Sequence, residues 1–522
     1  MKGTMGHDAV VVGSGAAGGF VASALTEAGF RVLVLEAGEP RLPHELPALD
    51  APLDRSPDFL REASERQAIQ LRHACFGRET RRLFVDDLDH PYTTPEGSPF
   101  DWIRARQVGG RTLTWGGVTP RFSDFELAAG RYDGLSPSFP VSHAELDPFY
   151  REAERAWRVC GSTEGLAQLP DGEFASPRPM TRAELELKRA VEARFPGRRV
   201  IPSRGLVLGV PGADGFPLST KSGVHSRALG SGRLTLRTGA VVHRIETNAD
   251  GRRATALEVV ELATGRRETV PARVVFVCAS TIESTRILLS SKGRLHPEGL
   301  ANSSGALGHY LMDHPSIGVF GRLPAPAREH EPLGGAHGIC IPRFQNVGDE
   351  RAAFARGYSI WGGAARVHPA IPFADCFVLH ASAEMLPRYE CSVSLDPERV
   401  DAWGIPVPHI RCDYADNEHA LLEDARERLL EMAGEVGWSV QHVDDPSTPG
   451  GWVHELGTAR MGDDPRTSVL DPFNCAWDVR NLYVTDGAAF PASGCQNPTL
   501  TIAALSLRAA AHAAARLGRG EL

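Results

Sequence analysis

One histidine lies in the segment GWVHELGTARMG, residues 451 to 462, and one asparagine lies in the segment QNPTL, residues 496 to 500. The imidazole of His454 has an ordinary pKa near neutrality, and the amide of Asn497 can both donate and accept a hydrogen bond. An imidazole of this pKa can act as a general base, and an amide can orient the group that loses the proton. Each signal is unspecific alone, because most histidines are structural and Asn before Pro is a common helix start.

A glycine-rich turn near the N-terminus has the pattern of a dinucleotide site. Four apolar residues, Ala9 to Val12, precede GSGAAG, residues 13 to 18, and a helical stretch leads to a second apolar run that ends at Glu36. In the spacing G-x-G-x-x-G, the first glycine permits the turn, the second admits a pyrophosphate, and the third lets helix pack on strand. The helix N-terminus favours the phosphate charge, and Glu36 can accept ribose hydroxyls. The contacts expected here are Gly13, Ser14, Gly15, Ala16, Ala17, Gly18, Glu36 and Ala37.

This pattern serves NAD, NADP and FAD, but the carboxylate of Glu36 would repel the 2'-phosphate of NADP. The chain continues for almost 500 residues without a second fingerprint, which is typical of flavoproteins, whose FAD collects contacts from remote segments. We expect such contacts from the loop at 107–117, the strands near 242 and 279, and the C-terminal block. The residues concerned are Gly109, Gly110, Thr112, Thr114, Trp115, Gly116, Val242, Ala279, Asp486, Gly487, Pro498 and Thr499.

Hydrophobic periodicity places these segments on regular elements. Residues 233–246 and the run ATALEVVEL are separated by a turn at 248–251, and their alternation predicts a hairpin. Residues 273–278 predict a strand, after which Ser280 and Glu283 predict a helix start. Near the C-terminus, a short strand at 482–484 is followed by an alanine-rich helix, for which Asn497 is the predicted N-cap and Pro498 the first helical residue.

Composition excludes several function classes. At 522 residues, with 42% apolar and 23% charged residues, the chain is long enough for two or more well-buried domains. A net charge of -9 leaves no broad positive field for nucleic acid or an anionic membrane. Nine cysteines without a CxxC pair indicate neither a disulfide scaffold nor a zinc site, so we expect no metal and a cytoplasmic setting. The uncharged run 487–507 contains two prolines and predicts a loop entering a buried helix, not a membrane span.

Several segments, in this order along the chain, resemble the glucose-methanol-choline (GMC) oxidoreductases. They are the fingerprint with Glu36, VGGRTLTWGG at 108–117, CASTIESTRILLSS at 278–291, LGHYLMDHP at 307–315, HELGTARMG at 454–462, and the tail from NLYVTDG to NPTLTIAAL. The likeness extends over nearly the whole length, with residues 320 to 450 the least recognisable. It implies an α/β fold in which a Rossmann-like FAD domain carries a substrate domain with a mainly antiparallel sheet. We expect residues 1–130, 225–305 and 455–522 in the first domain, and 131–224 and 306–454 in the second.

The resemblance also implies FAD as cofactor, oxidation of an alcohol to a carbonyl, and a catalytic pair that falls on His454 and Asn497. His454 would take the hydroxyl proton while the flavin N5 receives the hydride, and Asn497 would orient the hydroxyl. The helix N-terminus near Pro498 and Thr499 would stabilise the reduced flavin. In fungal pyranose oxidases a histidine before the tryptophan of the flavin loop binds FAD covalently. Here Thr114 precedes Trp115, so we expect non-covalent FAD.

Residues 85–112 look like the bacterial branch that contains glycoside 3-dehydrogenases, glycoside 3-oxidases and pyranose oxidases. This implies oxidation of a secondary hydroxyl of a sugar or glycoside to a ketone, with C3 favoured over C2. Oxygen, a quinone or another small redox carrier would reoxidise the flavin. Three alternatives stay open: a non-sugar alcohol as substrate, a redox-inactive lyase of the hydroxynitrile type, and a binding role in which FAD only stabilises the fold. The sequence leaves the oligomeric state open.

Overall fold

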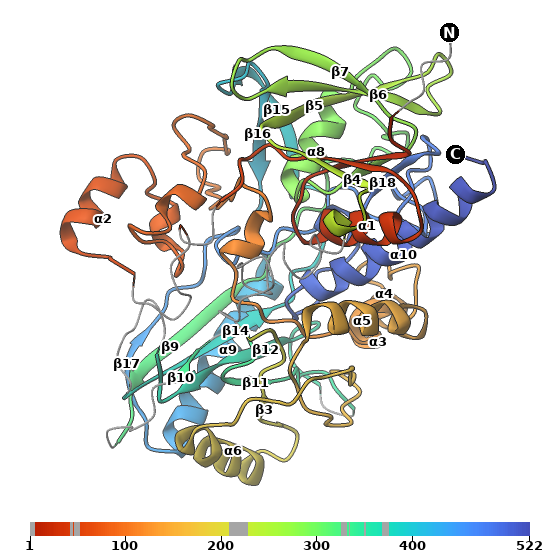
Figure 1. Ribbon diagram of the computed structural model, residues 1–522. Helices are drawn as coiled ribbons and strands as arrows, with labels where there is room; N and C mark the ends of the chain where they lie inside the picture. The colour runs from red at the N-terminus through yellow and green to blue at the C-terminus, as the bar shows by residue number, and fades with distance from the viewer. Residues whose placement is uncertain are drawn as a thin grey trace.

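The computed structural model describes residues 6–41, 45, 53–207, 228–324, 331–333, 335–348, 351–367 and 375–522. Short apolar runs within them form a five-stranded parallel sheet with the strand order β18-β8-β1-β2-β4 (Figure 1). The strands are β1 (Ala9–Val12), β2 (Val32–Leu35), β4 (Leu234–Arg237), β8 (Val275–Val277) and β18 (Leu482–Val484). All four ladders are parallel, so the carboxyl ends of the strands share one edge of the sheet.

That edge explains why residues far apart in the sequence come together. Gly13 follows β1, Glu36 follows β2, Ala279 lies two residues beyond β8, and Asp486 lies two residues beyond β18. In open parallel sheets, ligands bind beyond the carboxyl ends of the strands. The sheet therefore positions segments from both ends of the chain around one site.

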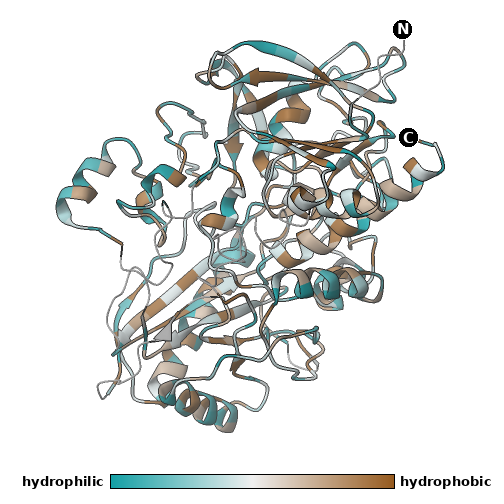
Figure 2. Cartoon of the chain, viewed as in Figure 1, coloured by the Kyte–Doolittle hydropathy of each residue, from teal (hydrophilic) through white to brown (hydrophobic). Residues whose placement is uncertain are grey.

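The two faces of the parallel sheet pack against different layers, because side chains of a strand alternate between faces. Ala9 and Val11 of β1 belong to a core with α1 (Ala16–Glu27) and α10 (Thr499–Gly518). Val10 and Val12 belong to a second core that includes residues of a three-stranded antiparallel sheet. The strands of that sheet are β5 (Ala240–Thr247), β6 (Ala254–Glu261) and β7 (Arg267–Pro271). Figure 2 shows the hydrophobic colouring of the parallel strands between these layers.

A six-stranded sheet with the order β17-β9-β14-β12-β11-β3 forms the other half of the molecule, and its ladders are antiparallel. Its strands are β3 (Ile201–Pro202), β9 (Ser316–Arg322), β11 (Ile339–Ile341), β12 (Tyr358–Ala364), β14 (Cys376–Ala383) and β17 (Ser439–Val443). One face of this sheet is covered by α9 (Asp416–Glu435) and α6 (Arg182–Arg194) in a common hydrophobic core. The opposite face is free to line a cavity.

The remaining elements surround these sheets (Figure 1). The helices are α2 (Pro57–Ser64), α3 (Asp124–Leu127), α4 (Ala129–Asp133), α5 (His143–Trp157) and α8 (Thr281–Ser290). The short 3-10 helices are η2 (Gln70–Arg72), η3 (Arg81–Leu83), η4 (Gly110–Leu113) and η5 (Gly487–Ala489). Two pairs of strands stand apart from the main sheets: β15 (Ser392–Val400) with β16 (Pro406–Arg411), and β10 (Glu331–Pro332) with β13 (Arg366–Val367).

The predicted fold class is confirmed: the chain has an α/β structure with a parallel Rossmann-like sheet and separate antiparallel sheets. The hairpin prediction needs a correction at its first strand. Residues 234–237 pair with β2 in the parallel sheet, and only 240–247 pair with 254–261, because Gly239 turns the chain between the two sheets with a φ of +61°. The division into two domains stays a prediction, and its boundaries at 224 and 225 lie outside the described residues.

Candidate functional site

A cavity of about 1090 Å³ lies between the carboxyl edge of the parallel sheet and the uncovered face of the six-stranded sheet. Its walls include residues from β1, the loop at 107–117, α8, β14 and the C-terminal block. All of the predicted site residues line it except Gly18 and Gly109. The cavity thus brings together the predicted cofactor residues and the predicted catalytic pair.

The three glycines of the turn after β1 have different surroundings. Gly13 has a φ of +96°, and a Cβ atom there would lie 2.4 Å from the carbonyl oxygen of Cys278. A Cβ atom on Gly18 would lie 2.0 Å from the carbonyl oxygen of Gly13, so Gly18 is a packing residue behind the turn. A Cβ atom on Gly15 would meet nothing within 4 Å, and this open position faces the cavity at the N-terminus of α1.

Ser14 connects three of the predicted segments. Its backbone N–H donates to Oε2 of Glu36 over 2.9 Å, and its hydroxyl donates to the same oxygen. The backbone N–H of Gly109 donates to the Ser14 hydroxyl over 3.0 Å, and the N–H of Gly38 donates to Oε1 of Glu36 over 2.8 Å. Burial raises the pKa of Glu36, and these hydrogen bonds oppose that rise. Gly109 therefore holds the loop at 107–117 against the turn and does not line the cavity.

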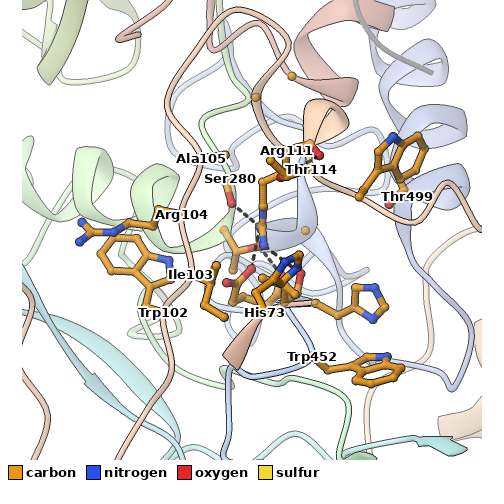
Figure 3. A pocket seen from close by; sticks show the side chains of 18 of the residues that line it. His73, Trp102, Ile103, Arg104, Ala105, Arg111, Thr114, Ser280, Trp452 and Thr499 are labelled. Carbon is orange, nitrogen blue, oxygen red and sulfur yellow. Dashed lines mark hydrogen bonds and ion pairs between the residues drawn. The ribbon is translucent and has the colours of Figure 1, made fainter. Parts of the chain in front are cut away.

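The loop at 107–117 contributes Trp115 and Arg111 to the lining of the cavity. Figure 3 shows Arg111 beside Ser280. The indole N–H of Trp115 is buried and has no hydrogen-bond partner among the described residues. Arg111 donates to the carbonyl oxygen of Val453 over 2.8 Å and to the hydroxyl of Ser280 over 2.7 Å, and it forms an ion pair of 2.6 Å with Glu455. These contacts tie the loop to the segment that carries the predicted base.

The start of α8 departs from the predicted cap. The helix begins at Thr281, but the side chain of Ser280 makes no capping hydrogen bond and its φ is +80°. The hydroxyl of Ser280 accepts from Arg111 instead, while Glu283 forms an ion pair with Arg286. A tertiary contact of Ser280 and an ion pair within the helix have replaced the capping pattern that the sequence predicts.

The side chains of His454 and Asn497 lie next to each other although 43 residues separate them. The Nε2 atom of His454 is 3.3 Å from the Nδ2 atom of Asn497. On its other side, the Nδ1 atom of His454 is 2.8 Å from the Nδ1 atom of His314. The sequence prediction of Asn497 as a helix cap is wrong: Pro498 precedes the first helical residue Thr499, and no side chain caps α10. The Asn497 amide contacts His454 instead.

These contacts fix the proton positions on the two imidazoles. Burial lowers the pKa of His454 well below its usual value, and that of His314 to about 4, so both rings are neutral at pH 7. The Nε2 atom of His314 lies 3.3 Å from the carbonyl oxygen of Ser493, which can only accept, so Nε2 carries the proton. The Nδ1 atom of His314 then accepts from Nδ1–H of His454. We infer that Nε2 of His454 is unprotonated and that its lone pair accepts from the Nδ2–H of Asn497.

Asp313 holds the backbone that carries the base. Its carboxylate accepts from the N–H groups of Gly450, Trp452 and His454 at distances of 2.8, 3.3 and 3.0 Å. Between the last two, Val453 has a φ of +62°, a conformation that a β-branched residue rarely adopts. Burial and the charge of Glu455 raise the pKa of Asp313 to about 7. The strained turn that directs the imidazole into the cavity is thus stabilised by one buried carboxyl group.

The residues present fit an FAD molecule. Gly15 leaves its backbone open at a helix N-terminus, Glu36 offers a buried carboxylate at the end of β2, and the unpartnered indole N–H of Trp115 lies in the same cavity. Asp486 is buried and accepts hydrogen bonds from Ser284 and from the N–H of Ala488, and burial raises its pKa to about 6. Phosphate, ribose and ring sites are therefore available along one continuous cavity.

Sequence reasoning did not assign several residues of this site. His314 and Asp313 lie in the segment 307–315, which is one of the motifs that carry the family resemblance, but nothing in the local sequence places this segment beside His454. Trp361 and His380 lie on β12 and β14, where strand alternation alone marks neither as facing a cavity. Their position depends on the pairing of strands across the six-stranded sheet.

Two features are absent from the residues that the structure describes. Within those ranges, no group of three or more His, Cys, Asp or Glu side chains could hold a metal ion. Among the helices that the structure describes, none has the length and apolar character needed to cross a membrane.

Comparison with known proteins identifies relatives of the whole chain. A family model described as GMC oxidoreductase matches residues 387–506. The 2-methyl-1,2-propanediol dehydrogenase of Mycolicibacterium austroafricanum is 30% identical over 96% of this chain and 94% of its own length. A C-glycoside 3-oxidase of Microbacterium trichothecenolyticum is 25% identical over 78% of this chain and 75% of its own length.

A likeness also extends to solved structures. The crystal structure of pyridoxine 4-oxidase from Mesorbium loti superposes with a TM-score of 0.60 at 20% identity, over 97% of this chain and 99% of that one. At this identity the likeness concerns the fold alone, and it includes both the parallel and the antiparallel parts of the molecule.

Proposed function

This chain belongs to the GMC oxidoreductase family, and from that premise we propose that it oxidises a secondary ring hydroxyl of a sugar or glycoside to a ketone. Membership makes it an FAD-dependent oxidoreductase that acts on an alcohol or sugar hydroxyl. We favour C3 of a pyranose ring over C2, in line with the sequence of residues 85–112 and the C-glycoside 3-oxidase relative. The FAD is proposed to be non-covalent because Thr114 precedes Trp115.

The observation that carries the proposal is the position of Nε2 of His454, 3.3 Å from the amide nitrogen of Asn497 in the wall of the cavity, while Nδ1 contacts His314. In this proposal Nε2 takes the proton of the substrate hydroxyl, and the Asn497 amide donates to the hydroxyl oxygen and orients it. The Nδ1–H of His454 donates to His314, which keeps the ring from turning. Bound FAD supplies the two-electron acceptor. The residues of the cavity position the substrate, exclude water and hold the proton.

The cofactor contacts are proposed to follow the segments that line the cavity. Gly13 to Ala17 and the N-terminus of α1 would hold the pyrophosphate, and Glu36 would accept the ribose hydroxyls. The loop from Gly110 to Gly116 and the segment from Asn497 to Thr499 would lie against the ring system. Oxygen or a small redox carrier as acceptor, and the cytoplasmic setting, stay predictions.

A second candidate substrate class is a small non-sugar diol. The 2-methyl-1,2-propanediol dehydrogenase is 30% identical over nearly the whole chain, so this class has support from sequence similarity. A redox-inactive lyase would also keep the cofactor site, but it would need no hydride acceptor.

The test is a screen of flavin reduction without oxygen, against monosaccharides, O- and C-glycosides, small diols and simple alcohols. We expect bleaching of the flavin by a pyranose or glycoside, and NMR of the product should locate the carbonyl at C3. Bleaching by diols alone would overturn the sugar assignment. A flavin that no alcohol reduces, in a protein that cleaves a cyanohydrin, would establish the lyase instead.

A further inference from the structure

The wall of the cavity opposite the parallel sheet consists of three ordered rows of side chains. The register of β12, β14 and β9 aligns Ser359 with Ser382 and Ser316, and two residues further along it aligns Trp361 with His380 and Gly318. A third row consists of Gly363, Val378 and Phe320. The cavity is lined by all of these except the two glycines. The residues between the rows, such as Ile360, Ala381 and Ile317, pack under α9 instead.

The serine row is the one nearest to the predicted catalytic pair. Ser316 lies two residues after His314 in the chain, and the hydroxyl of Ser359 donates over 2.9 Å to the carbonyl oxygen of Cys495, two residues before Asn497. The second row lies about 7 Å further along the strands, because a strand rises about 3.3 Å per residue. The wall therefore offers polar side chains beside the chemistry and aromatic side chains beyond it.

Aromatic rings surround His380 in the second row. Its ring is stacked with Trp361 at 6.5 Å and 21°, and it lies 5.5 Å from Trp452 and 5.1 Å from Phe320. Gly318 makes room for this arrangement, since a Cβ atom there would lie 2.3 Å from Nδ1 of His380 and 2.6 Å from Oδ2 of Asp444. The second row is thus a rigid aromatic surface of the kind against which the C–H face of a sugar can pack.

Two polar atoms of this wall lack a partner. The hydroxyl of Ser382, a residue only 8% exposed, and the indole N–H of Trp361 have no hydrogen-bond partner among the described residues. A buried donor without a partner destabilises a fold, so a ligand that supplies the missing acceptor gains affinity from it. Ser382 and Trp361 occupy diagonal positions of neighbouring strands, with Cα atoms expected about 7–8 Å apart.

We propose that Ser382 and Trp361 are specificity-determining residues that bind two separate oxygens of a pyranose ring. The Ser382 hydroxyl binds a hydroxyl next to the reacting one, and the Trp361 indole donates to an oxygen further along the ring, which packs against His380. A small diol has only two oxygens, so with one at His454 and the other at Ser382 it has none left for Trp361. The wall therefore selects a polyhydroxylated ring, an inference that rests on the proposed function and names part of its substrate site.

The experiment compares the variants Ser382→Ala and Trp361→Phe, each of which removes one polar group and keeps most of the volume. Matched controls are Ser290→Ala and Trp157→Phe, because the side-chain polar atoms of these two residues also lack a partner within the described part of the chain but lie outside the cavity. Flavin reduction is measured with methyl β-D-glucopyranoside and with butane-2,3-diol. Calorimetry of methyl β-D-glucopyranoside binding to the holoenzyme, with its flavin already reduced and oxygen excluded, gives a second readout that does not depend on turnover, because a reduced flavin cannot accept a hydride.

With the glucoside, we expect each cavity variant to lose about tenfold in kcat/KM and in affinity, and the controls to stay within twofold of the wild type. With the diol, only Ser382→Ala should have an effect, because the diol lacks the oxygen for Trp361. Cavity variants that match their controls on the glucoside would overturn the assignment of the wall while leaving the proposed function intact.

The two hypotheses fail separately. If no sugar reduces the wild-type flavin, the proposed function is wrong, and the binding measurement alone then tests whether Ser382 and Trp361 bind a sugar. Binding of the glucoside that both cavity variants weaken would then still support the subsite. Absence of binding to the wild type, or binding that neither variant changes, would overturn it.

Discussion

His314 and His454 are joined by a contact of 2.8 Å between their Nδ1 atoms, and their rings meet at an angle of 84°. Because the other nitrogen of His314 faces a backbone carbonyl, this contact makes Nδ1 of His454 a donor and leaves Nε2 as the acceptor. A residue 140 positions away in the chain thus determines which nitrogen of the predicted base is basic.

The first prediction concerns the base itself. His454→Ala should keep the FAD content of the wild type but lower the rate of flavin reduction by about 10² or more, because the proton acceptor is lost while the cofactor contacts remain. Rapid-mixing kinetics without oxygen measure this rate. A variant that reduces its flavin within a few-fold of the wild-type rate would show that His454 is structural.

The second prediction concerns His314 as a positioning residue. His314→Ala leaves Nδ1–H of His454 without its acceptor, so the ring can turn or change tautomer, and flavin reduction should fall by about tenfold or more. The loss of a buried neighbour should also move the acid limb of the pH profile upward, since His314 helps to lower the pKa of His454. A purely structural role for His314 would change thermal stability without moving that limb.

The third prediction is the pH dependence of flavin reduction. The base must be neutral to accept a proton, and burial lowers its pKa below 6.5, so the rate should persist as the pH falls through 6.5 and be lost only in more acidic solution. Rates measured from pH 4 to 9 test this. Burial raises the pKa of Asp313 to about 7, and this carboxyl group accepts from the backbone N–H of His454. Because the acid limb is assigned to His454, it should remain in Asp313→Asn. An acid limb at or above pH 6.5 in the wild type would contradict the prediction.

The fourth prediction concerns the attachment of the cofactor. Acid or heat precipitation of the purified protein should leave a yellow supernatant, because Thr114 stands where covalent relatives have a histidine and cannot form the usual link. Mass spectrometry of the supernatant should identify FAD. Flavin that stays with the precipitate would disprove non-covalent binding.

The fifth prediction separates two glycines of the same turn. Gly13→Ala should strongly destabilise the protein, by about 1 kcal/mol or more, because the backbone has a φ of +96° and the new methyl group would overlap the carbonyl of Cys278. Gly15→Ala should fold like the wild type, since its Cβ meets no atom within 4 Å, yet bind FAD less tightly. Thermal unfolding of the apoproteins and FAD titrations measure the two effects. Equal melting temperatures for both variants would refute this assignment of roles.

Local chemistry made much of the fold readable in advance. The strand, glycine turn and helix from Ala9 to Glu27 follow from apolar runs and from the freedom of Gly13, and these are interactions within a few residues of each other. The same holds for the alanine-rich helix α10, although it begins at Thr499 and not at the predicted Pro498. The local sequence predicts Ser280 and Asn497 as helix caps, because a cap depends only on neighbouring residues. In the structure, Ser280 contacts Arg111 and Asn497 contacts His454, which are distant in the sequence.

The sequence by itself determined the family, the cofactor, the strand and helix types, and the two residues predicted to carry the chemistry, because each depends on short motifs whose order is preserved. Only the tertiary structure decided which nitrogen of His454 is unprotonated, since that depends on contacts with His314 and Ser493, which lie on other segments of the chain. It also decided that Ser382 and Trp361 share a cavity wall. Strand alternation says that a side chain leaves one face of a sheet, but the pairing of strands and the helix packed behind them determine which face meets the substrate.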